Sequence, residues 1–300
     1  MRNDSIQEQM IDFTYSSPTY SIPRRAFIRT IEALGGQPRL KKLYLNYAID
    51  DADGRDFFQA AIDSLQLNVK MNQSRLALIP KSGPVLFVAN HPYGVIDGIA
   101  LTWLAEQVRP DIKVLANHVL CQVPETEKSL LPIDFSGNKK ALETNVQSRR
   151  SALHHLKDGG AIGIFPGGGV AASVNPLKGP AVDPIWHPFT AKLARCSETV
   201  IVPVYFGGQN SRIFQIASHV SYTLRLALYF FETARRIKSD FEIGVGEPIG
   251  PEEIRSYDDR QELLRFLRQK TFELAKSVEP VGKNVPRFDA EYSYPSHFKL

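Results

Sequence analysis

Short apolar runs that alternate with helix-like stretches are the feature of this 300-residue sequence that most limits its possible folds. Amphipathic patterns typical of helices lie between several of the runs, notably at about 139–157 and 186–196, and another helix is expected to begin near Asp97. Strands that alternate with helices predict an α/β fold with a central, mostly parallel sheet flanked by helices. The runs that predict strands are 75–80, 84–90, 112–116, 161–165, 199–205 and 241–245.

The N-terminal part of the chain has a different pattern. Residues 1–23 are polar and rich in turn residues, which predicts an extended arm. Three helices are expected after it: one from Ala26 to the Gly35-Gly36 stop, one around 40–47, and one over about 55–67. The resulting division is an N-terminal arm and helical cap over 1–70, an α/β domain over 71–280 and a C-terminal tail over 281–300.

Charge and cysteine content exclude several classes of function. A net charge of +4 is too weak to indicate nucleic-acid binding without a basic and aromatic motif, and the sequence has no such motif. A mild basic excess does suit contact with anionic lipid headgroups or an acidic carrier protein. Cys121 and Cys196 match neither C-x-x-C nor metal-ligand spacing, so neither a disulfide framework nor a zinc site is expected.

The distribution of apolar residues along the sequence indicates where in the cell the protein is expected to lie. The first residues contain no apolar signal region, and no apolar run approaches the roughly 18 residues of a spanning helix. We therefore expect a cytoplasmic protein, peripheral to the inner face of the membrane. Two basic and apolar segments, 24–29 and 224–231, suit a membrane surface, although both also suit helices that pack on a sheet.

Three polar or glycine-rich segments follow predicted strands, at the sheet edge where parallel α/β folds bind ligands. They are N-H-P-Y-G-V-I-D at 90–97, P-G-G-G-V-A at 166–171 and F-G-G-Q-N-S-R at 206–212. Three loops at one edge of a sheet can converge on one substrate.

The first segment contains a candidate catalytic pair. His91 follows a buried strand and precedes Pro92, so its ring is expected to project from a strand-to-helix turn. Asp97 can accept the second imidazole N–H and leave the other nitrogen to take a proton. The same aspartate can instead serve only as the N-cap of the next helix. The spacing alone leaves both interpretations open.

Taken together, N-H-P-Y-G-V-I-D-G, F-P-G-G-G-V and V-P-V-Y-F-G-G-Q-N-S-R resemble the glycerolipid (lysophospholipid) acyltransferase superfamily, particularly its hemolysin-like branch, over about 81–250. The resemblance implies direct transfer of a fatty acyl group from an acyl carrier protein or coenzyme A thioester, with no other cofactor, to a lipid acceptor. In this reading His91 is the general base and Asp97 orients it, while Asn90, Tyr93 and Gly94 contact substrate. The absence of a G-x-S-x-G nucleophile elbow agrees with such direct transfer.

Two departures from the superfamily pattern bear on the reaction. Most members have four residues between the histidine and the aspartate, whereas this chain has five, and we expect Gly94 to absorb the extra residue in a bulge. The usual F-P-E-G block, followed by a small residue and Arg, here reads Phe165-Pro166-Gly167-Gly168-Gly169-Val170. Without that Glu and Arg, glycerol-3-phosphate is disfavoured, and a lyso-lipid with another headgroup or an amino-acid-based lipid is left.

Substrate-binding candidates remain in the second and third segments. Gly167, Gly168 and Gly169, beside Phe165 and Pro166, can present backbone N–H groups to an anion or a developing oxyanion, or they can simply turn the chain. In the third segment Asn210 and Arg212 are candidates, and Arg212 can replace the missing arginine. The alternative for Arg212 is an exposed loop arginine without a ligand.

Three classes of function therefore remain open. The first is an acyltransferase. The second is a thioesterase or lipid hydrolase that uses the same His-Asp pair to activate water. The third is a catalytically inactive lipid-binding module associated with the membrane.

Overall fold

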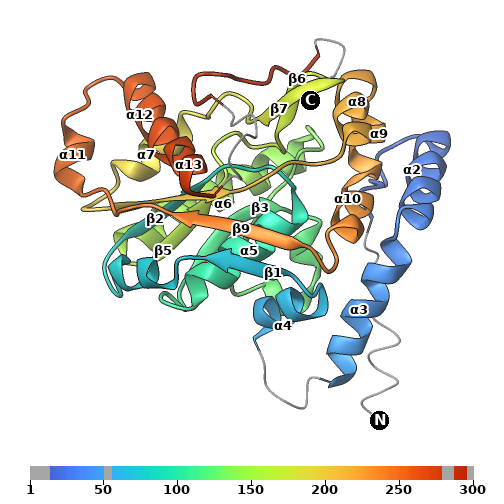
Figure 1. The fold of residues 1–300 in the computed structure, drawn as a ribbon, viewed down its shortest axis with the longest axis horizontal. Helices are drawn as coiled ribbons and strands as arrows, with labels where there is room; N and C mark the ends of the chain where they lie inside the picture. The colour runs from blue at the N-terminus through green and yellow to red at the C-terminus, as the bar shows by residue number, and fades with distance from the viewer. Residues whose placement is uncertain (1–13, 51–55, 279–286, 296–300) are drawn as a thin grey trace.

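The structure, a computed structural model, describes residues 14–50, 56–278 and 287–295. Its centre is a seven-stranded sheet in the order β1-β9-β8-β2-β5-β3-β4 (Figure 1). Every pair of neighbours in it is parallel except β8 and β9, which confirms the predicted mostly parallel α/β sheet. The strands are β1 (Asn68–Met71), β2 (Val85–Ala89), β3 (Lys113–Asn117), β4 (Leu130–Ile133), β5 (Ala161–Ile164), β8 (Val200–Phe206) and β9 (Asp240–Val245).

Helices cover both faces of the sheet because successive residues of a strand point to opposite sides. Val85 and Phe87 of β2 belong to one apolar core, whereas Leu86 and Val88 belong to another. The first core packs against α4 (Phe57–Ser64) and α5 (Val95–Glu106). The second packs against α6 (Lys139–Lys157), α7 (Phe189–Ala194) and α12 (Arg260–Glu273).

The other elements surround this centre. They are helices α2 (Ile22–Leu34), α3 (Gln37–Asp50), α8 (Arg212–Val220), α9 (Tyr222–Ala227), α10 (Tyr229–Arg235), α11 (Pro251–Arg255) and α13 (Ala275–Val278), the hairpin β6 (Ala172–Asn175) and β7 (Lys178–Val182), and the short 3₁₀ helices η2 (Gln73–Leu78), η3 (Leu120–Gln122) and η4 (Pro124–Thr126).

The helical cap consists of α2, α3 and α4, and its first two helices run along one side of the domain beside α9 and α10 (Figure 1). The first of them begins at Ile22 and not at Ala26, because Pro23 fits the first turn of a helix and extends it toward the N-terminus. The described part of the predicted arm is anchored, since Tyr15 is buried against the rings of Tyr229 and Phe230. Most of the arm, 1–13, lies outside the described residues.

Two local predictions near the domain boundary are wrong. Residues 75–80 form most of η2 and no strand, because the Asn72 side chain accepts the N–H of Ser74 and turns the chain. The edge strand is β1 instead, and it lies where the third helix was expected to end. That helix stops at Ser64, and Gln66 has a positive φ of 50° that redirects the chain toward β1. The boundary placed after residue 70 therefore falls inside β1.

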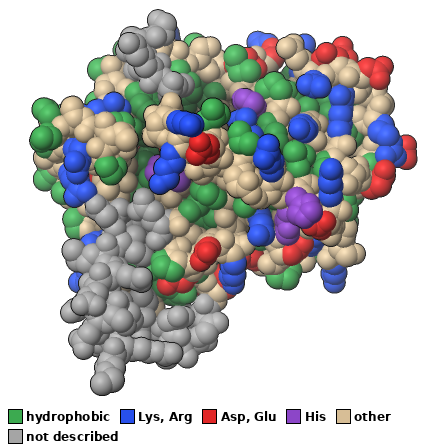
Figure 2. Space-filling view, turned by 180° about the vertical axis from the view of Figure 1, so that it is seen from behind, with side chains coloured by type: hydrophobic (Ala, Val, Ile, Leu, Met, Phe, Trp, Pro, Cys, Tyr) green, Lys and Arg blue, Asp and Glu red, His purple; other side chains and the backbone are tan. Residues whose placement is uncertain are grey.

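The two segments proposed to meet a membrane differ in exposure. Segment 224–231 is mostly buried, with Arg225 fully enclosed, so of its two alternatives the packed helix holds and the membrane surface does not. In α2, by contrast, Ile22, Phe27 and Leu34 are exposed. Within the described ranges, none of the helices has the length and apolar character needed to cross a membrane. On the face shown in Figure 2, Lys and Arg side chains are scattered among apolar and acidic ones and form no single patch.

Candidate active site

The turn between β2 and α5 brings His91 and Asp97 together. Gly94 is the N-cap of α5 and has a φ of 97°, a conformation that glycine adopts without strain. This is the bulge expected to absorb the extra residue of the His-Asp spacing. Asp97 is therefore the third residue of the helix and not its N-cap, a correction that leaves its carboxylate facing back toward the turn.

One oxygen of Asp97 organises the whole turn. Oδ2 accepts the backbone N–H groups of Tyr93 and Gly94 at 2.7 and 2.9 Å, and it lies 2.9 Å from Nδ1 of His91. The carboxylate is fully buried, whereas the His91 side chain keeps 17% of its surface exposed. Because the carboxylate holds the proton on Nδ1, the unprotonated Nε2 is left to accept one.

The remaining contacts of His91 lock its position. Its ring stacks on Phe165 with 4.1 Å between the ring centroids. Its backbone N–H donates to Oδ1 of Asp183 at 3.1 Å, and its carbonyl accepts the N–H of Ala171 at 2.7 Å. Asp183 also accepts the indole N–H of Trp186, and burial raises the pKa of this carboxyl. The histidine is thus held by two loops distant in sequence.

The side chain of His91 lines a cavity of about 340 Å³, which we call the histidine cavity. Seven predicted site residues line it: His91, Gly94, Phe165, Pro166, Gly167, Gly168 and Gly169. Its other walls are Tyr15, Val95, Gly98, Leu115, Ala116, Asn117, Leu120, Ile133, Phe135, Arg149, Ile164, Val170, Ile185, His187, Phe189, Tyr222, Leu226, Tyr229 and Tyr294. The first two predicted loops therefore converge on one site.

The glycine loop, 167–169, forms part of the wall of this cavity. The N–H of Gly168 closes a turn onto the Phe165 carbonyl, and Gly168 has a positive φ of 65°. Among the described residues, the N–H groups of Gly167 and Gly169 have no recorded acceptor. The hydroxyl of Tyr294 lies so close above Gly169 that a Cβ there would sit 2.0 Å from it. Any larger residue at position 169 would displace this tyrosine.

Three residues predicted to contact substrate do not line the histidine cavity. The Asn90 side chain exchanges two hydrogen bonds with the backbone of Phe206, which ties the ends of β2 and β8 together. The Tyr93 hydroxyl donates to the Gly207 carbonyl, and the Asn210 amide donates to the Tyr93 carbonyl. These groups hold the first and third loops against each other, and their direct contact with substrate stays a prediction.

Arg212 is also misplaced by the prediction. Its guanidinium donates to the Ser173 hydroxyl at 3.1 Å and to the Gly179 carbonyl at 2.7 Å, and both acceptors belong to the β6–β7 hairpin. Arg212 does not line the histidine cavity, so it does not replace the missing arginine there.

Sequence reasoning missed five residues of the site: Tyr15, Arg149, Asp183, His187 and Tyr294. They come from the arm, α6, the loop before α7 and the C-terminal segment, where no motif marks them. The H-P dipeptide at His187 was a weak signal, since it resembles the first block. Burial and the charge of Arg149 lower the pKa of His187. No cluster of His, Cys, Asp and Glu suited to a metal ion occurs within the described ranges.

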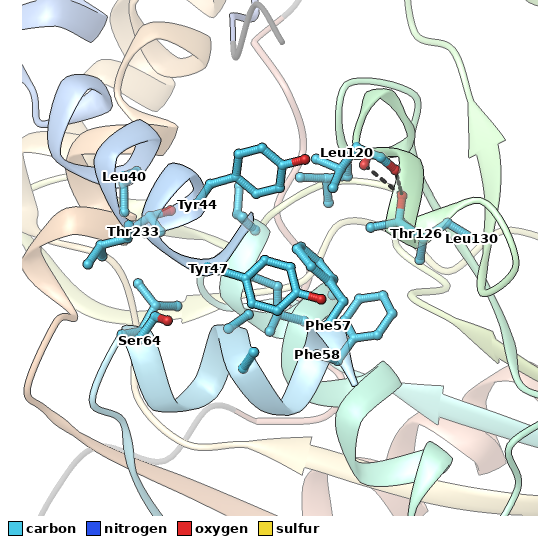
Figure 3. A pocket seen from close by; sticks show the side chains of 18 of the residues that line it. Leu40, Tyr44, Tyr47, Phe57, Phe58, Ser64, Leu120, Thr126, Leu130 and Thr233 are labelled. Atoms are coloured by element: carbon cyan, nitrogen blue, oxygen red, sulfur yellow. Dashed lines mark hydrogen bonds between the residues drawn. The ribbon is translucent and has the colours of Figure 1, made fainter. Parts of the chain in front are cut away.

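A second cavity, of about 130 Å³, lies between the cap helices and α5, and we call it the cap cavity. Its wall includes Tyr44 and Tyr47 of α3 and Phe57 and Phe58 of α4 (Figure 3), and the rings of Tyr47 and Phe57 are in edge-to-face contact with 5.6 Å between their centroids. Its walls are almost wholly apolar, and none of them carries an Asp, Glu, Lys, Arg or His side chain. The two cavities share Val95, Gly98 and Leu120 as walls, so they lie on either side of one partition.

Known proteins resemble this chain in sequence. Residues 42–281 match the model of a family described as Acyltransferase. A lyso-glycine lipid O-acyltransferase of Bacteroides thetaiotaomicron is 28% identical over 220 residues, which cover 69% of this chain and 75% of the relative. A lyso-glycine lipid O-acyltransferase of Phocaeicola vulgatus is 24% identical over 204 residues, 65% of this chain and 69% of the relative.

A solved structure also resembles the fold. It is the 1-acyl-sn-glycerophosphate acyltransferase PlsC of Thermotoga maritima, with a TM-score of 0.48 and 16% sequence identity. The alignment covers 85% of this chain and 80% of that one.

Proposed function

Because this chain belongs to the acyltransferase family, we propose that it moves a fatty acyl group from a thioester donor to the hydroxyl of a lyso-lipid, with His91 as general base. The observation that carries the proposal is the bond between His91 Nδ1 and the buried Asp97 carboxylate at the wall of a cavity. The relatives are named for O-acyl transfer to a lyso-glycine lipid, which supports an acceptor headgroup based on an amino acid.

The chemistry requires two proton transfers. His91 Nε2 takes the proton of the acceptor hydroxyl as its oxygen attacks the thioester carbonyl. The carbonyl oxygen becomes an oxyanion, and we assign its stabilisation to the N–H groups of Gly167 and Gly169, two residues of the cavity wall. Collapse breaks the carbon–sulfur bond, and the imidazolium returns its proton to the leaving sulfur. The products are an ester and a free thiol, with no covalent acyl-enzyme.

The cap cavity supports a fatty substrate. Its walls offer no ionisable partner except the tyrosines, and it borders the histidine cavity at Gly98, where the helix carries no side chain. In this proposal an apolar chain whose carbonyl lies beside His91 passes Gly98 and buries its methylenes in the cap cavity, each worth about 0.8 kcal/mol. We assign this cavity to the chain of the transferred acyl group.

The donor and the place of action complete the proposal. Acyl carrier protein and coenzyme A thioesters are both compatible with direct transfer, and a mildly basic chain suits an acidic carrier.

We assign the membrane contact to α2, whose exposed Ile22, Phe27 and Leu34 accompany Arg24 and Arg25. Phe27→Glu should then reduce sedimentation with anionic vesicles, and unchanged sedimentation would remove α2 from this role. A cytoplasmic location and membership of the hemolysin-like branch stay predictions.

The decisive experiment incubates the purified protein with a labelled acyl thioester and a panel of lyso-lipids and amino lipids, followed by mass analysis of the products. We expect an acylated amino lipid, lost in His91→Ala and retained in His154→Ala, which changes an exposed histidine on α6. Free fatty acid released without any acceptor would favour a hydrolase. Lipid binding without turnover would favour an inactive binding module.

A further inference from the structure

The charges around the histidine cavity are all of one sign. Its 26 wall residues include one guanidinium, that of Arg149, and two imidazoles, those of His91 and His187, but no Asp or Glu. Asp97 lies behind His91 and is fully buried. A ligand that brings a negative charge into this cavity therefore meets a cation and N–H donors, and no carboxylate at the wall repels it.

Arg149 is held at this wall by an aromatic ring. It lies on α6, and its guanidinium carbon sits 5.4 Å from the ring centroid of Phe189, at the start of α7. No carboxylate partner is recorded for Arg149 within the part of the chain that the structure describes. Arg149 is exposed, so its N–H donors are available to a ligand that enters the cavity, and the attraction to the ring favours a position beside Phe189.

His187 provides a second donor beside it. Its Nδ1 accepts the backbone N–H of Phe189 at 3.2 Å, so in the neutral ring the proton is on Nε2. His187 and Arg149 both line the cavity, and both contact Phe189. A planar guanidinium and a neighbouring imidazole N–H match the oxygens of a carboxylate or a phosphate.

We infer that Arg149, with His187, binds the anionic headgroup of the acceptor lipid. This assignment rests on the proposed function and deepens it. The second block of this chain lacks the family's arginine, and Arg212 points into the hairpin, so the cation at the cavity comes from α6 instead. A lipid whose glycine amine is acylated retains such a carboxylate, and a lysophospholipid offers the same charge on a phosphate.

The test uses amphiphiles that cannot react. Binding of N-palmitoylglycine, its methyl ester and hexadecyl phosphate is measured by calorimetry to the wild type, Arg149→Ala and Arg150→Ala. Arg150 is the matched control because it is the next residue of α6, is exposed and does not line the cavity. We expect Arg149→Ala to weaken N-palmitoylglycine binding about 10- to 100-fold, as for a lost charge-assisted hydrogen bond, and to leave the methyl ester unchanged.

The other outcomes separate the sources of the anion and the two proposals. Equal losses for the carboxylate and the phosphate would assign a general anion site, and a loss for the phosphate alone would identify a lysophospholipid acceptor. Equal losses for the acid and its methyl ester, or no loss for either anion, would overturn the inference. Absence of turnover in the wild type with intact, Arg149-dependent binding would overturn the proposed function and leave the headgroup site standing.

Steady-state kinetics distinguish binding of the headgroup by Arg149 from a merely structural role of this residue. With a reactive anionic acceptor, Arg149→Ala should raise KM for the acceptor and leave KM for the thioester unchanged, and Arg149→Lys should recover part of the loss. A rise in KM for the thioester alone would place the donor's phosphates at Arg149 and overturn the inference.

Discussion

The histidine cavity and the cap cavity share the partition formed by Val95, Gly98 and Leu120, yet their other walls differ in kind. The histidine cavity has imidazoles, a guanidinium and glycine N–H groups around its apolar surface. The cap cavity has four aromatic rings from α3 and α4 and no charged side chain (Figure 3). In our proposal this contrast separates the reaction from the burial of the acyl chain by one turn of α5.

The largest effect is expected from Asp97→Asn, which removes the negative charge of the carboxylate that contacts His91. In Asp97→Asn the amide keeps the size of the side chain but no longer enforces the proton on His91 Nδ1, so transfer should fall on the order of 10²–10⁴-fold. Steady-state kinetics with the labelled thioester measure this fall. Asp158→Asn, which alters the exposed His154–Asp158 pair of α6, is the control and should keep full activity. Activity of Asp97→Asn within threefold of the wild type would contradict the assigned pair.

A smaller effect is expected from closing the partition. A Cβ at Gly98 would lie 3.6 Å from Leu120, an ordinary contact, so Gly98→Ala should be tolerated and serves as the control. Gly98→Phe should block access to the cap cavity and shift the preference toward shorter acyl chains, by roughly fourfold for each methylene left unburied, at about 0.8 kcal/mol each. Competition between thioesters of different length measures the shift. An unchanged length profile would place the acyl chain elsewhere.

The smallest effect concerns how the cap is held. Glu106 at the end of α5 accepts the Ser129 hydroxyl, and burial, with a contribution from the Asp56 carboxyl that caps α4, raises the pKa of Glu106 to about 7. A raised carboxyl pKa means that the folded state holds the proton more tightly than the unfolded state. This contribution to stability is present below about pH 4.5 and is lost as the pH rises to about 7.

Glu106→Gln should therefore be more stable than the wild type at pH 8 and equally stable near pH 4.5. The difference should stay below about 1 kcal/mol, because the carboxyl is partly exposed and solvent screens it. Denaturant titrations at the two pH values measure it, with the exposed Glu143→Gln of α6 as the control. A wild type that is the more stable protein at pH 8 would show that the sign is wrong.

Predictions from the sequence succeeded where the signal was local. The runs at 84–90, 112–116, 161–165, 199–205 and 241–245 each overlap a strand, because a continuous apolar segment is typical of a strand buried on both faces. The edge strand β1 has the alternating sequence N-V-K-M and was missed, since pairing with β9 and not apolar content makes it a strand. Segment 75–80 is the opposite case. It is rich in apolar residues, which predicted a strand, but it pairs with no strand of the sheet and forms part of η2.

In the site, too, features within one turn could be predicted from the sequence, whereas contacts between distant loops could not. The pairing of His91 with Asp97 and the bulge at Gly94 could be predicted because all three lie within one turn of seven residues. Asn90, Tyr93 and Asn210 belong to the predicted loops, but their side chains satisfy buried backbone groups of neighbouring loops and do not line the histidine cavity. Tertiary packing decides whether such a side chain contacts a neighbouring loop or faces the cavity.

By itself, the sequence determined the strand-helix alternation, the His91–Asp97 turn and the glycine loop, because each depends on contacts between residues close together in the chain. The tertiary structure alone decided that Arg149 and not Arg212 faces the cavity, that Tyr15 and Tyr294 close it, and that the cap encloses an apolar pocket. These contacts join segments far apart in the chain, and no local pattern encodes them. The histidine cavity is thus a local catalytic turn completed by distant side chains, which are the ones that choose the substrate in our proposal.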